Sequence, residues 1–348
     1  MKAAVLHGNN NIQYEEVDKP YVGPNMVLVK VKAVGICGSD IPRVFSGGAH
    51  FYPIILGHEF SGEIVAIGAE VKNLKIKDHV AGVPLIPCMK CEDCLNGNYA
   101  FCKNYNFIGS RVNGAFAEYV SLPAENAILI DKTIPFSTAA FFEPATVALH
   151  GLFCNQYEPG KKVAILGSGT IGLFVLQWAK KIGAESITVM DISPSKLETA
   201  KKYGADYTIN TISDDTQRIT NEITGSRGFD FLFETAGNNI TMQMSFDLAG
   251  NKSRICFIGT SPKEVCFSSK LFEKMNRKEF LLTGSWMSYS SPFPGVEWKM
   301  TADSFADGTI YINNDMIHKK YHLSDVYSAF EEFKNPQNIS GKILIVND

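Results

Sequence analysis

Between Lys161 and Trp286 the sequence alternates short apolar segments with stretches long enough to form helices. Apolar segments of this kind, separated by helices, are typical of parallel strands that are buried on both faces of a sheet. Six of them would complete a doubly wound sheet of the Rossmann type. The sequence therefore predicts an α/β fold here, with strands at Val163–Leu166, Ser186–Asp191, Asp206–Asn210, Phe229–Glu234, Arg254–Ile258 and Phe280–Gly284.

The first 150 residues have a different pattern. They are rich in glycine, proline and short β-branched runs, such as Val27–Val31 and Gly62–Gly68, which indicates mostly β structure. The tail ends in the strand-like run Lys342–Val346, which does not continue the alternation and is expected to return to the first domain. A chain of 348 residues exceeds the usual size of one domain. We therefore expect a β-rich domain over 1–150 with 287–348, and a doubly wound domain over 151–286.

Charge and hydropathy argue against several classes of protein. The chain has 33 basic and 36 acidic residues, and no block of lysine and arginine that could neutralise a run of phosphates. Its most apolar stretch, Val163–Ala179, is interrupted by glycines and polar residues and is too short to span a membrane. The N-terminus lacks the apolar segment of a signal peptide. We expect no nucleic-acid partner, no membrane span and a cytoplasmic location.

A glycine-rich turn, Gly167-Ser168-Gly169-Thr170-Ile171-Gly172, follows the first predicted strand and leads into the helical window Leu173–Ile182. In this context the glycines permit a tight turn, allow the backbone to approach a pyrophosphate and let the helix pack on the strand. Asp191 ends the next strand, where a carboxylate can accept a hydrogen bond from a ribose 2′-hydroxyl and would repel a 2′-phosphate. The segment predicts NAD rather than NADP; the alternative is a glycine-rich turn beside a surface aspartate.

Two later turns, Thr235–Gly237 and Ile258–Thr260, end strands on the same carboxyl edge. Ligands of open α/β sheets bind at this edge, although either segment could be only a turn. The predicted NAD contacts are Gly167, Gly169, Thr170, Ile171, Gly172, Asp191, Lys196, Ile258 and Ser285.

Four cysteines, Cys88, Cys91, Cys94 and Cys102, crowd into one short segment. Four thiolates from one loop can form a closed tetrahedral shell around a structural zinc ion, with no position left for substrate. An iron–sulfur cluster, two disulfides or free thiols are the alternatives, and the spacing alone does not exclude iron.

Three further motifs lie in the first part of the chain: Cys37-Gly38-Ser39-Asp40, Gly57-His58-Glu59 and Glu143-Pro144. Separately none is informative, because a lone cysteine or histidine is usually a core residue. Their order and context resemble the medium-chain, zinc-containing dehydrogenase superfamily over essentially the whole chain. Within it the chain is most similar to the polyol branch and its galactitol-1-phosphate 5-dehydrogenases. The closer resemblance rests on Gly35–Arg43, Gly48–Pro53, Gly57–Gly62, Phe107–Arg111 and Gly284–Pro292.

The resemblance implies a GroES-like catalytic domain with a zinc lobe, a Rossmann domain, and a homodimer or homotetramer. It implies two zinc ions per chain, the catalytic one held by Cys37, His58 and Glu143, with Glu59 as an alternating or water-linked ligand. Alcohol dehydrogenases of the superfamily have a second cysteine in place of Glu143, and the polyol branch shares this departure.

One thiolate and one carboxylate would neutralise Zn²⁺ and leave a fourth position open, so that the metal could act as a Lewis acid on an alcohol that gives hydride to NAD. Ser39 could pass the hydroxyl proton towards solvent, or be only a turn hydroxyl. Asp40 is expected to orient His58. The predicted catalytic residues are thus Ser39, Asp40 and Glu59.

A polyol phosphate needs a polar pocket and a cation. The candidate substrate residues are Arg43, His50, Tyr52, Arg111 and Trp286. The resemblance implies oxidation of galactitol 1-phosphate to tagatose 6-phosphate. An unphosphorylated polyol such as sorbitol, a pentitol phosphate or threonine are alternative substrates, and a non-enzymatic binding protein is an alternative that the intact ligand set disfavours. Lys342 could approach the cofactor or cover surface.

Overall fold

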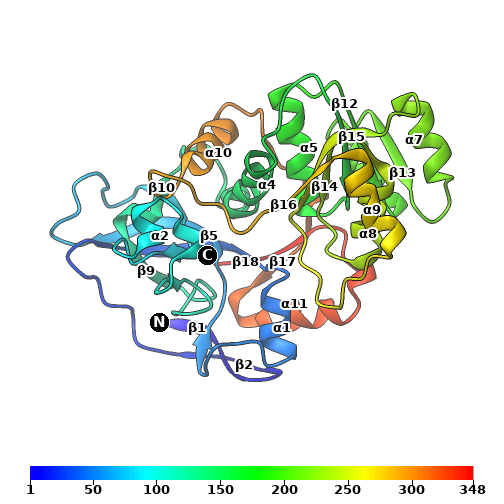
Figure 1. Ribbon diagram of the computed structural model, residues 1–348. Coiled ribbons are helices and arrows are strands. Elements are labelled where there is room, and N and C mark those ends of the chain that lie inside the picture. The colour runs from blue at the N-terminus through cyan, green and yellow to red at the C-terminus, as the bar shows by residue number, and fades with distance from the viewer. Residues whose placement is uncertain (348) are drawn as a thin grey trace. The chain divides into compact units, whose positions relative to one another are not determined.

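The computed structural model describes residues 1–347, which divide into two compact units (Figure 1). Unit 1 comprises Met1–Glu143 and the tail from Tyr289 onward, and unit 2 comprises Pro144–Ser288. Helix α4 (Phe142–Cys154) runs across the first boundary. No helix within residues 1–347 combines the length and apolarity that a membrane crossing requires.

Unit 1 is mostly β structure. Its largest sheet has the order β10-β6-β5-β3-β18-β17, and β9 also pairs with β3. The tail strand β18 (Lys342–Val346) pairs antiparallel with β3 (Met26–Gly35), so the expected return of the tail is present in the structure. The other strands of unit 1 are β1 (Lys2–Gly8), β2 (Asn11–Glu16), β4 (Ile54–Ile55), β5 (Glu59–Ile67), β6 (His79–Gly82), β7 (Leu85–Ile86), β8 (Asn106–Phe107), β9 (Tyr119–Pro123), β10 (Ala127–Leu129) and β17 (Ile317–His322).

Strand β3 illustrates why these residues form a sheet. Val29 and Val31 are fully buried while Lys30 and Lys32, which alternate with them, are partly exposed, which is the period-two pattern of a strand with one face on the core. The core beneath it also takes Val326 and Phe330 from α11 (Val326–Glu331). The remaining helices of unit 1 are α1 (Asp40–Phe45), α2 (Glu92–Leu95), α3 (Phe136–Ala139) and α10 (Val296–Ala306), with 3-10 turns at Tyr99–Phe101, Ala124–Asn126, Asn314–Met316, Leu323–Asp325, Glu332–Lys334 and Pro336–Asn338.

Unit 2 is a doubly wound sheet of six parallel strands in the order β13-β12-β11-β14-β15-β16. All six predicted strands are present, as β11 (Lys162–Leu166), β12 (Ser186–Asp191), β13 (Tyr207–Asn210), β14 (Phe229–Glu234), β15 (Ala249–Phe257) and β16 (Leu281–Gly284). The helices are α5 (Thr170–Ile182), α6 (Pro194–Lys202), α7 (Thr216–Thr224), α8 (Asn239–Leu248) and α9 (Ser269–Lys278).

Two predicted boundaries in unit 2 were wrong by several residues. Strand β15 begins at Ala249 rather than Arg254, because Ala249 already pairs with Phe229 before an irregularity in the register. Helix α5 begins at Thr170 rather than Leu173, and its first turn is closed by the Leu173 N–H donating to the Gly169 carbonyl at 2.9 Å. The glycine-rich turn therefore forms the start of the helix rather than preceding it.

Candidate active site

Cys37, His58 and Glu59 converge in unit 1. Strands β3 and β5 pair antiparallel with Gly35 opposite Glu59, which places the segment after β3 beside the start of β5. The donor atoms of the thiol, the imidazole and the carboxylate all lie within 4.8 Å of one another. One sulfur, one nitrogen and one oxygen donor at this spacing suit a catalytic zinc ion, which keeps a coordination position open.

Asp40 lies behind His58, as expected. Its Oδ1 is 3.6 Å from His58 Nδ1, and its Oδ2 accepts a hydrogen bond from the Cys37 backbone N–H at 3.1 Å. Burial acts to lower the pKa of His58, but the negative charges of Asp40 and Cys37 outweigh it and raise that pKa well above its usual range. Nδ1 is buried and has no hydrogen-bond partner within residues 1–347. A metal on the other ring nitrogen would fix the proton on Nδ1, facing the carboxylate.

Lys342 is the site residue that sequence reasoning misplaced. It is buried, and its ammonium donates to Glu59 Oε2 and to the Ile36 carbonyl. Burial acts to lower the pKa of Lys342, but the charges of Glu59 and Cys37 raise it above its ordinary value. The signal was a lysine inside the apolar run Lys342–Val346, since lysine is rarely buried without a partner.

Glu143, expected as the third zinc ligand, is not in the set of converging donors. It lies at the start of α4, close enough for charges to interact: burial and the neighbouring Glu59 raise its pKa to about 7, while His58 and Lys342 oppose this. The geometry favours Glu59 as the carboxylate ligand. Direct coordination by Glu143 stays a prediction.

Ser39, which precedes α1, is joined to Arg43 on that helix. The Arg43 guanidinium donates to the Ser39 carbonyl at 2.7 Å, to the Ser39 hydroxyl at 2.9 Å and to Asp40 at 3.4 Å. The Ser39 backbone N–H also donates to the Cys37 sulfur at 3.5 Å. Arg43 therefore fixes the predicted proton-relay hydroxyl as well as contributing positive charge beside the metal donors.

Three of the candidate substrate residues lie close enough to interact electrostatically: the charges of two arginines, Arg43 and Arg111, both act on His50. Burial lowers the pKa of His50, and the positive charges of Arg111 and then Arg43 lower it further. The Arg111 guanidinium lies 4.4 Å from the centre of the Tyr105 ring. The other two candidates have different settings: the Tyr52 hydroxyl donates to Asn9 at 3.2 Å, and Trp286 belongs to unit 2 and is exposed.

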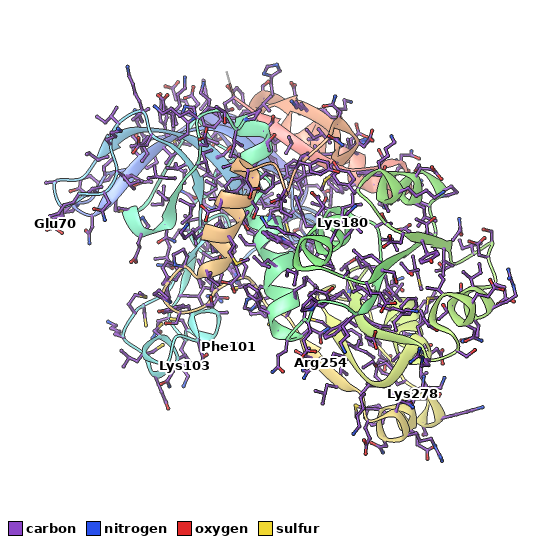
Figure 2. The ribbon with its side chains drawn as sticks, turned by 90° about the horizontal axis from the view of Figure 1, so that it is seen from above. Glu70, Phe101, Lys103, Lys180, Arg254 and Lys278 are labelled. Atoms are coloured by element: carbon purple, nitrogen blue, oxygen red, sulfur yellow. The ribbon has the colours of Figure 1, made fainter. Side chains whose placement is uncertain are left out.

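The four cysteines of the second predicted zinc site also converge, with all four sulfur atoms within 4.8 Å of one another. Their thiols are free, with 3.5 Å between the sulfurs of Cys91 and Cys94, so the disulfide alternative is wrong. The Cys94 N–H lowers the pKa of Cys91 to about 6, whereas burial raises that of Cys94 to about 12. Phe101 and Lys103 mark this lobe in Figure 2. A closed shell of four sulfurs fits a structural zinc ion.

The glycine-rich turn in unit 2 has the close backbone contacts that the sequence pattern requires. A Cβ at Gly172 would lie 1.9 Å from the Gly167 carbonyl oxygen, and Gly167 has a φ of +103°, so both positions require glycine. Asp191 faces the turn, because its Oδ2 accepts from the Ser168 N–H at 2.8 Å and its Oδ1 from the Ser193 N–H at 2.9 Å. This carboxylate is fixed beside the N-terminus of α5, where phosphates bind.

The remaining predicted cofactor residues lie on or near the same edge. The Ile258 N–H donates to the Glu234 carbonyl at 2.9 Å, and the Ser285 N–H donates to the Phe257 carbonyl at 3.0 Å. The Ser285 hydroxyl is buried without a hydrogen-bond partner in the described part of the chain, which leaves it available to a ligand. Lys196 uses its carbonyl to accept from the Ser168 hydroxyl at 3.0 Å.

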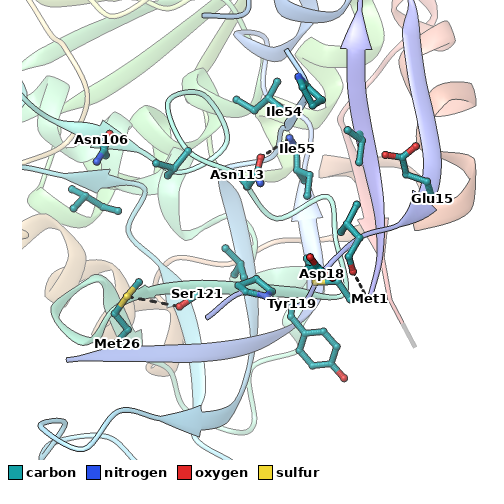
Figure 3. Close-up of a pocket in the computed structure, with 18 of the residues that line it drawn as sticks. Met1, Glu15, Asp18, Met26, Ile54, Ile55, Asn106, Asn113, Tyr119 and Ser121 are labelled. Carbon is teal, nitrogen blue, oxygen red and sulfur yellow. Dashed lines mark hydrogen bonds between the residues drawn. The ribbon is translucent and has the colours of Figure 1, made fainter. Parts of the chain in front are cut away.

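A cavity of about 640 Å³ in unit 1 lies apart from these residues. Figure 3 shows its lining, in which Asn113 accepts from the Ile55 N–H and the Ser121 hydroxyl faces the Met26 sulfur. Neither the metal donors nor the candidate substrate residues line it.

Comparisons with known proteins identify the family. The alcohol dehydrogenase GroES-like domain matches residues 23–132, and the zinc-binding dehydrogenase domain matches residues 170–302. Galactitol 1-phosphate 5-dehydrogenase of Escherichia coli K12 is 39% identical over 320 residues, covering 92% of each chain. The chain belongs to the zinc-binding alcohol dehydrogenase family. Sorbitol dehydrogenase of Bacillus subtilis is 38% identical over 344 residues, covering 96% of this chain and 95% of that one.

The crystal structure of galactitol-1-phosphate dehydrogenase from Escherichia coli superposes with a TM-score of 0.94 at 37% identity, covering both chains completely. The predicted combination of a GroES-like domain and a Rossmann sheet is therefore confirmed. So is the expected enzyme class: the chain is a zinc-dependent oxidoreductase of the alcohol and polyol dehydrogenases that uses NAD. The two groups of donors found in unit 1 fit its catalytic and structural zinc ions.

Proposed function

We propose that this dehydrogenase oxidises a secondary hydroxyl of a sugar-alcohol phosphate, converting galactitol 1-phosphate to tagatose 6-phosphate. Unit 1 supplies the catalytic residues and unit 2 binds NAD. The single observation that supports a phosphorylated substrate is the pair of arginines, Arg43 and Arg111, whose charges both act on His50 and which adjoins the metal donors through the contacts of Arg43 with Ser39 and Asp40.

The zinc-holding residues in this proposal are Cys37, His58 and Glu59. When bound, zinc supplies Lewis acidity towards the substrate hydroxyl and NAD supplies the hydride acceptor. Asp40 orients His58 and stabilises its positive charge. Ser39 relays the substrate hydroxyl proton: its hydroxyl, held in place by Arg43, would accept that proton while passing its own proton to solvent, and its backbone is tied to Cys37.

Arginine suits a phosphate because its planar guanidinium donates two parallel hydrogen bonds to the oxygens. Arg43 has already committed one nitrogen to Ser39 and Asp40. Arg111 has its ring contact with Tyr105 and no carboxylate partner within residues 1–347, so it is the residue freer to bind the phosphate.

Cofactor reduction, followed by the near-ultraviolet absorbance of NADH, tests the proposal. The substrates are galactitol 1-phosphate, galactitol, sorbitol, ribitol 5-phosphate and threonine. Turnover confined to galactitol 1-phosphate would support it. Turnover only with an unphosphorylated polyol or threonine would be consistent with the zinc chemistry but would overturn the proposal of a phosphorylated substrate.

An unphosphorylated polyol is the second candidate. Its support is the identity to sorbitol dehydrogenase, 38%, which is close to the 39% identity to galactitol 1-phosphate 5-dehydrogenase. The two arginines, Arg43 and Arg111, are what favours the phosphorylated substrate.

Self-association into a homodimer or homotetramer, and a cytoplasmic location, remain part of the proposal. Strand β16 supports self-association: it is an edge strand whose Leu281 and Leu282 are exposed, and an exposed apolar edge can pair with the same edge of a second copy.

A further inference from the structure

Glu234 is a buried carboxylate that no step of the proposed chemistry uses. It ends β14, its side chain is fully buried, and no cation pairs with it within residues 1–347. A carboxylate in this setting is costly unless its oxygens accept hydrogen bonds, so its contacts show what it holds in place.

One carboxylate oxygen of Glu234 organises the turn that follows β14. Oε1 accepts from the backbone N–H groups of Ala236 at 2.9 Å and Gly237 at 2.8 Å, and from the Thr241 hydroxyl at 2.7 Å. These three donors belong to the turn and to the first turn of α8. The side chain therefore folds the segment after β14 back over the end of its own strand.

The same residue also fixes the neighbouring turn after β15. The Glu234 carbonyl accepts from the N–H groups of Ile258 and Gly259, both at 2.9 Å. A Cβ at Gly259 would lie 2.4 Å from the Gly237 nitrogen and 2.8 Å from Glu234 Oε2, so the two turns touch and only glycine fits between them. The Glu234 side chain thus fixes the turn after β14, and its backbone carbonyl fixes the turn after β15, which packs against the first.

The order of the strands shows which part of NAD this arrangement serves. Asp191 ends β12 and the glycine-rich turn follows β11, so in the proposed function the adenosine lies over β12 and the pyrophosphate over β11. Strand β14 is the neighbour of β11 on the other side, and β15 follows it. The nicotinamide half must therefore lie over the two turns that Glu234 fixes.

We infer that Glu234 is a positioning residue for the nicotinamide half of NAD, acting through the acceptor Oε1 on the turn Thr235–Gly237, against which the turn Ile258–Thr260 packs. It does not contact the cofactor. Oε2 is buried and without a hydrogen-bond partner in the described part of the chain, so the acceptor at Oε1, rather than a charge pair, is the property that matters. The inference rests on the orientation of NAD in the proposed function.

Isothermal titration of the zinc-loaded full chain with NAD, ADP-ribose and AMP tests it. Glu234→Leu, which removes the acceptor, should weaken NAD binding about tenfold or more while AMP affinity changes less than about twofold. Glu234→Gln keeps an acceptor oxygen and should recover most of the NAD affinity. The matched control is Glu222→Leu, at an exposed site on α7 where the carboxylate pairs with Arg218, and this variant should bind all three ligands as the wild type does.

Unchanged NAD affinity in Glu234→Leu would overturn the inference, and so would an equal loss of NAD and AMP, which would mean that Glu234 only holds unit 2 together. If Glu234→Leu does not fold, Thr241→Val carries the test, since it removes one of the three donors and should produce a smaller loss confined to NAD. The orientation of NAD on the sheet is tested separately with Asp191→Ala. If this variant binds AMP as tightly as the wild type, the adenosine does not lie over β12, and that result does not depend on Glu234.

Discussion

Glu59 accepts a hydrogen bond from the ammonium of Lys342, a residue 283 positions away in the sequence, while its carboxylate also lies among the zinc donors. The same carboxylate thus faces a fixed cation of the protein and the place of a metal cation. Each cation compensates the negative charge that Glu59 carries into a buried site.

Lys342→Met should therefore destabilise the zinc-free protein much more than the zinc-loaded protein. Breaking a buried ion pair leaves one charge uncompensated, at a cost of about 3 kcal/mol, and bound zinc would take over part of the compensation. The measurement is the free energy of unfolding in urea, with EDTA and with saturating zinc. Equal losses under the two conditions would show that Glu59 does not face the metal.

Metal analysis should find two zinc ions per chain, because two separate groups of donors converge in unit 1. Cys37→Ala should lose one ion and turnover while retaining the fold and NAD affinity. Cys91→Ser should also lose one ion, but its main effect should be on stability, because a closed shell does not touch substrate. A single zinc ion in the wild type would contradict the two-site arrangement, as would full activity in Cys37→Ala.

The four-cysteine lobe should show a pH dependence in its zinc-free form. The pKa of Cys91 lies at about 6 in the folded protein against 9.0 for an ordinary thiol, so the stabilisation from its thiolate is complete above 9.0 and is lost as the pH falls through about 6. Alkylation by iodoacetamide, read by peptide mass spectrometry, should thus rise for Cys91 around pH 6. Cys94, with a pKa of about 12, is the internal control and should stay unreactive at neutral pH. Zinc should protect both thiols; alkylation of Cys91 that begins only near pH 9 would refute the prediction.

Asp191→Ala should reduce the preference for NAD over NADP. The wild-type carboxylate would repel a 2′-phosphate and accept from a 2′-hydroxyl. It also accepts from the Ser168 N–H, so some loss with both cofactors is expected and the ratio of the two kcat/KM values is the informative quantity. An unchanged ratio would show that Asp191 does not contact the ribose 2′-hydroxyl.

Arg111→Ala should raise the KM for galactitol 1-phosphate about tenfold or more, since a charge-assisted hydrogen bond to the phosphate is lost, and should have little effect on any unphosphorylated polyol that the enzyme accepts. Arg218→Ala is the matched control, because Arg218 is exposed in unit 2. Equal effects of Arg111→Ala on phosphorylated and unphosphorylated substrates would place Arg111 away from the phosphate.

The repeating parts of the fold could be read from the sequence because each depends on local pattern. The six strands of unit 2 follow from buried apolar runs, and the turn at Gly167 follows from close backbone contacts that only glycine permits. The irregular start of β15 left no such pattern, because it depends on how Ala249 pairs with Phe229.

Contacts between distant segments were harder to predict. The sequence indicates Cys37 and His58 as metal ligands. Which carboxylate joins them, Glu59 or Glu143, depends on the pairing of β3 and β5, which places Glu59 beside them. Likewise the tie between Arg43 and Ser39 appears only once α1 sets their side chains one turn apart.

The pairing of β18 with β3 also has a consequence for synthesis on the ribosome. Unit 2 is one uninterrupted stretch of sequence and can fold as soon as it emerges, whereas unit 1 must wait for its last strand. Until Lys342 leaves the exit tunnel, the carboxylate of Glu59 has no ammonium beside it, and the thiol and imidazole next to it sit in an unfinished sheet. The buried surroundings of the metal donors are thus completed only after unit 2 has been made, although Cys37, His58 and Glu59 precede unit 2 in the sequence.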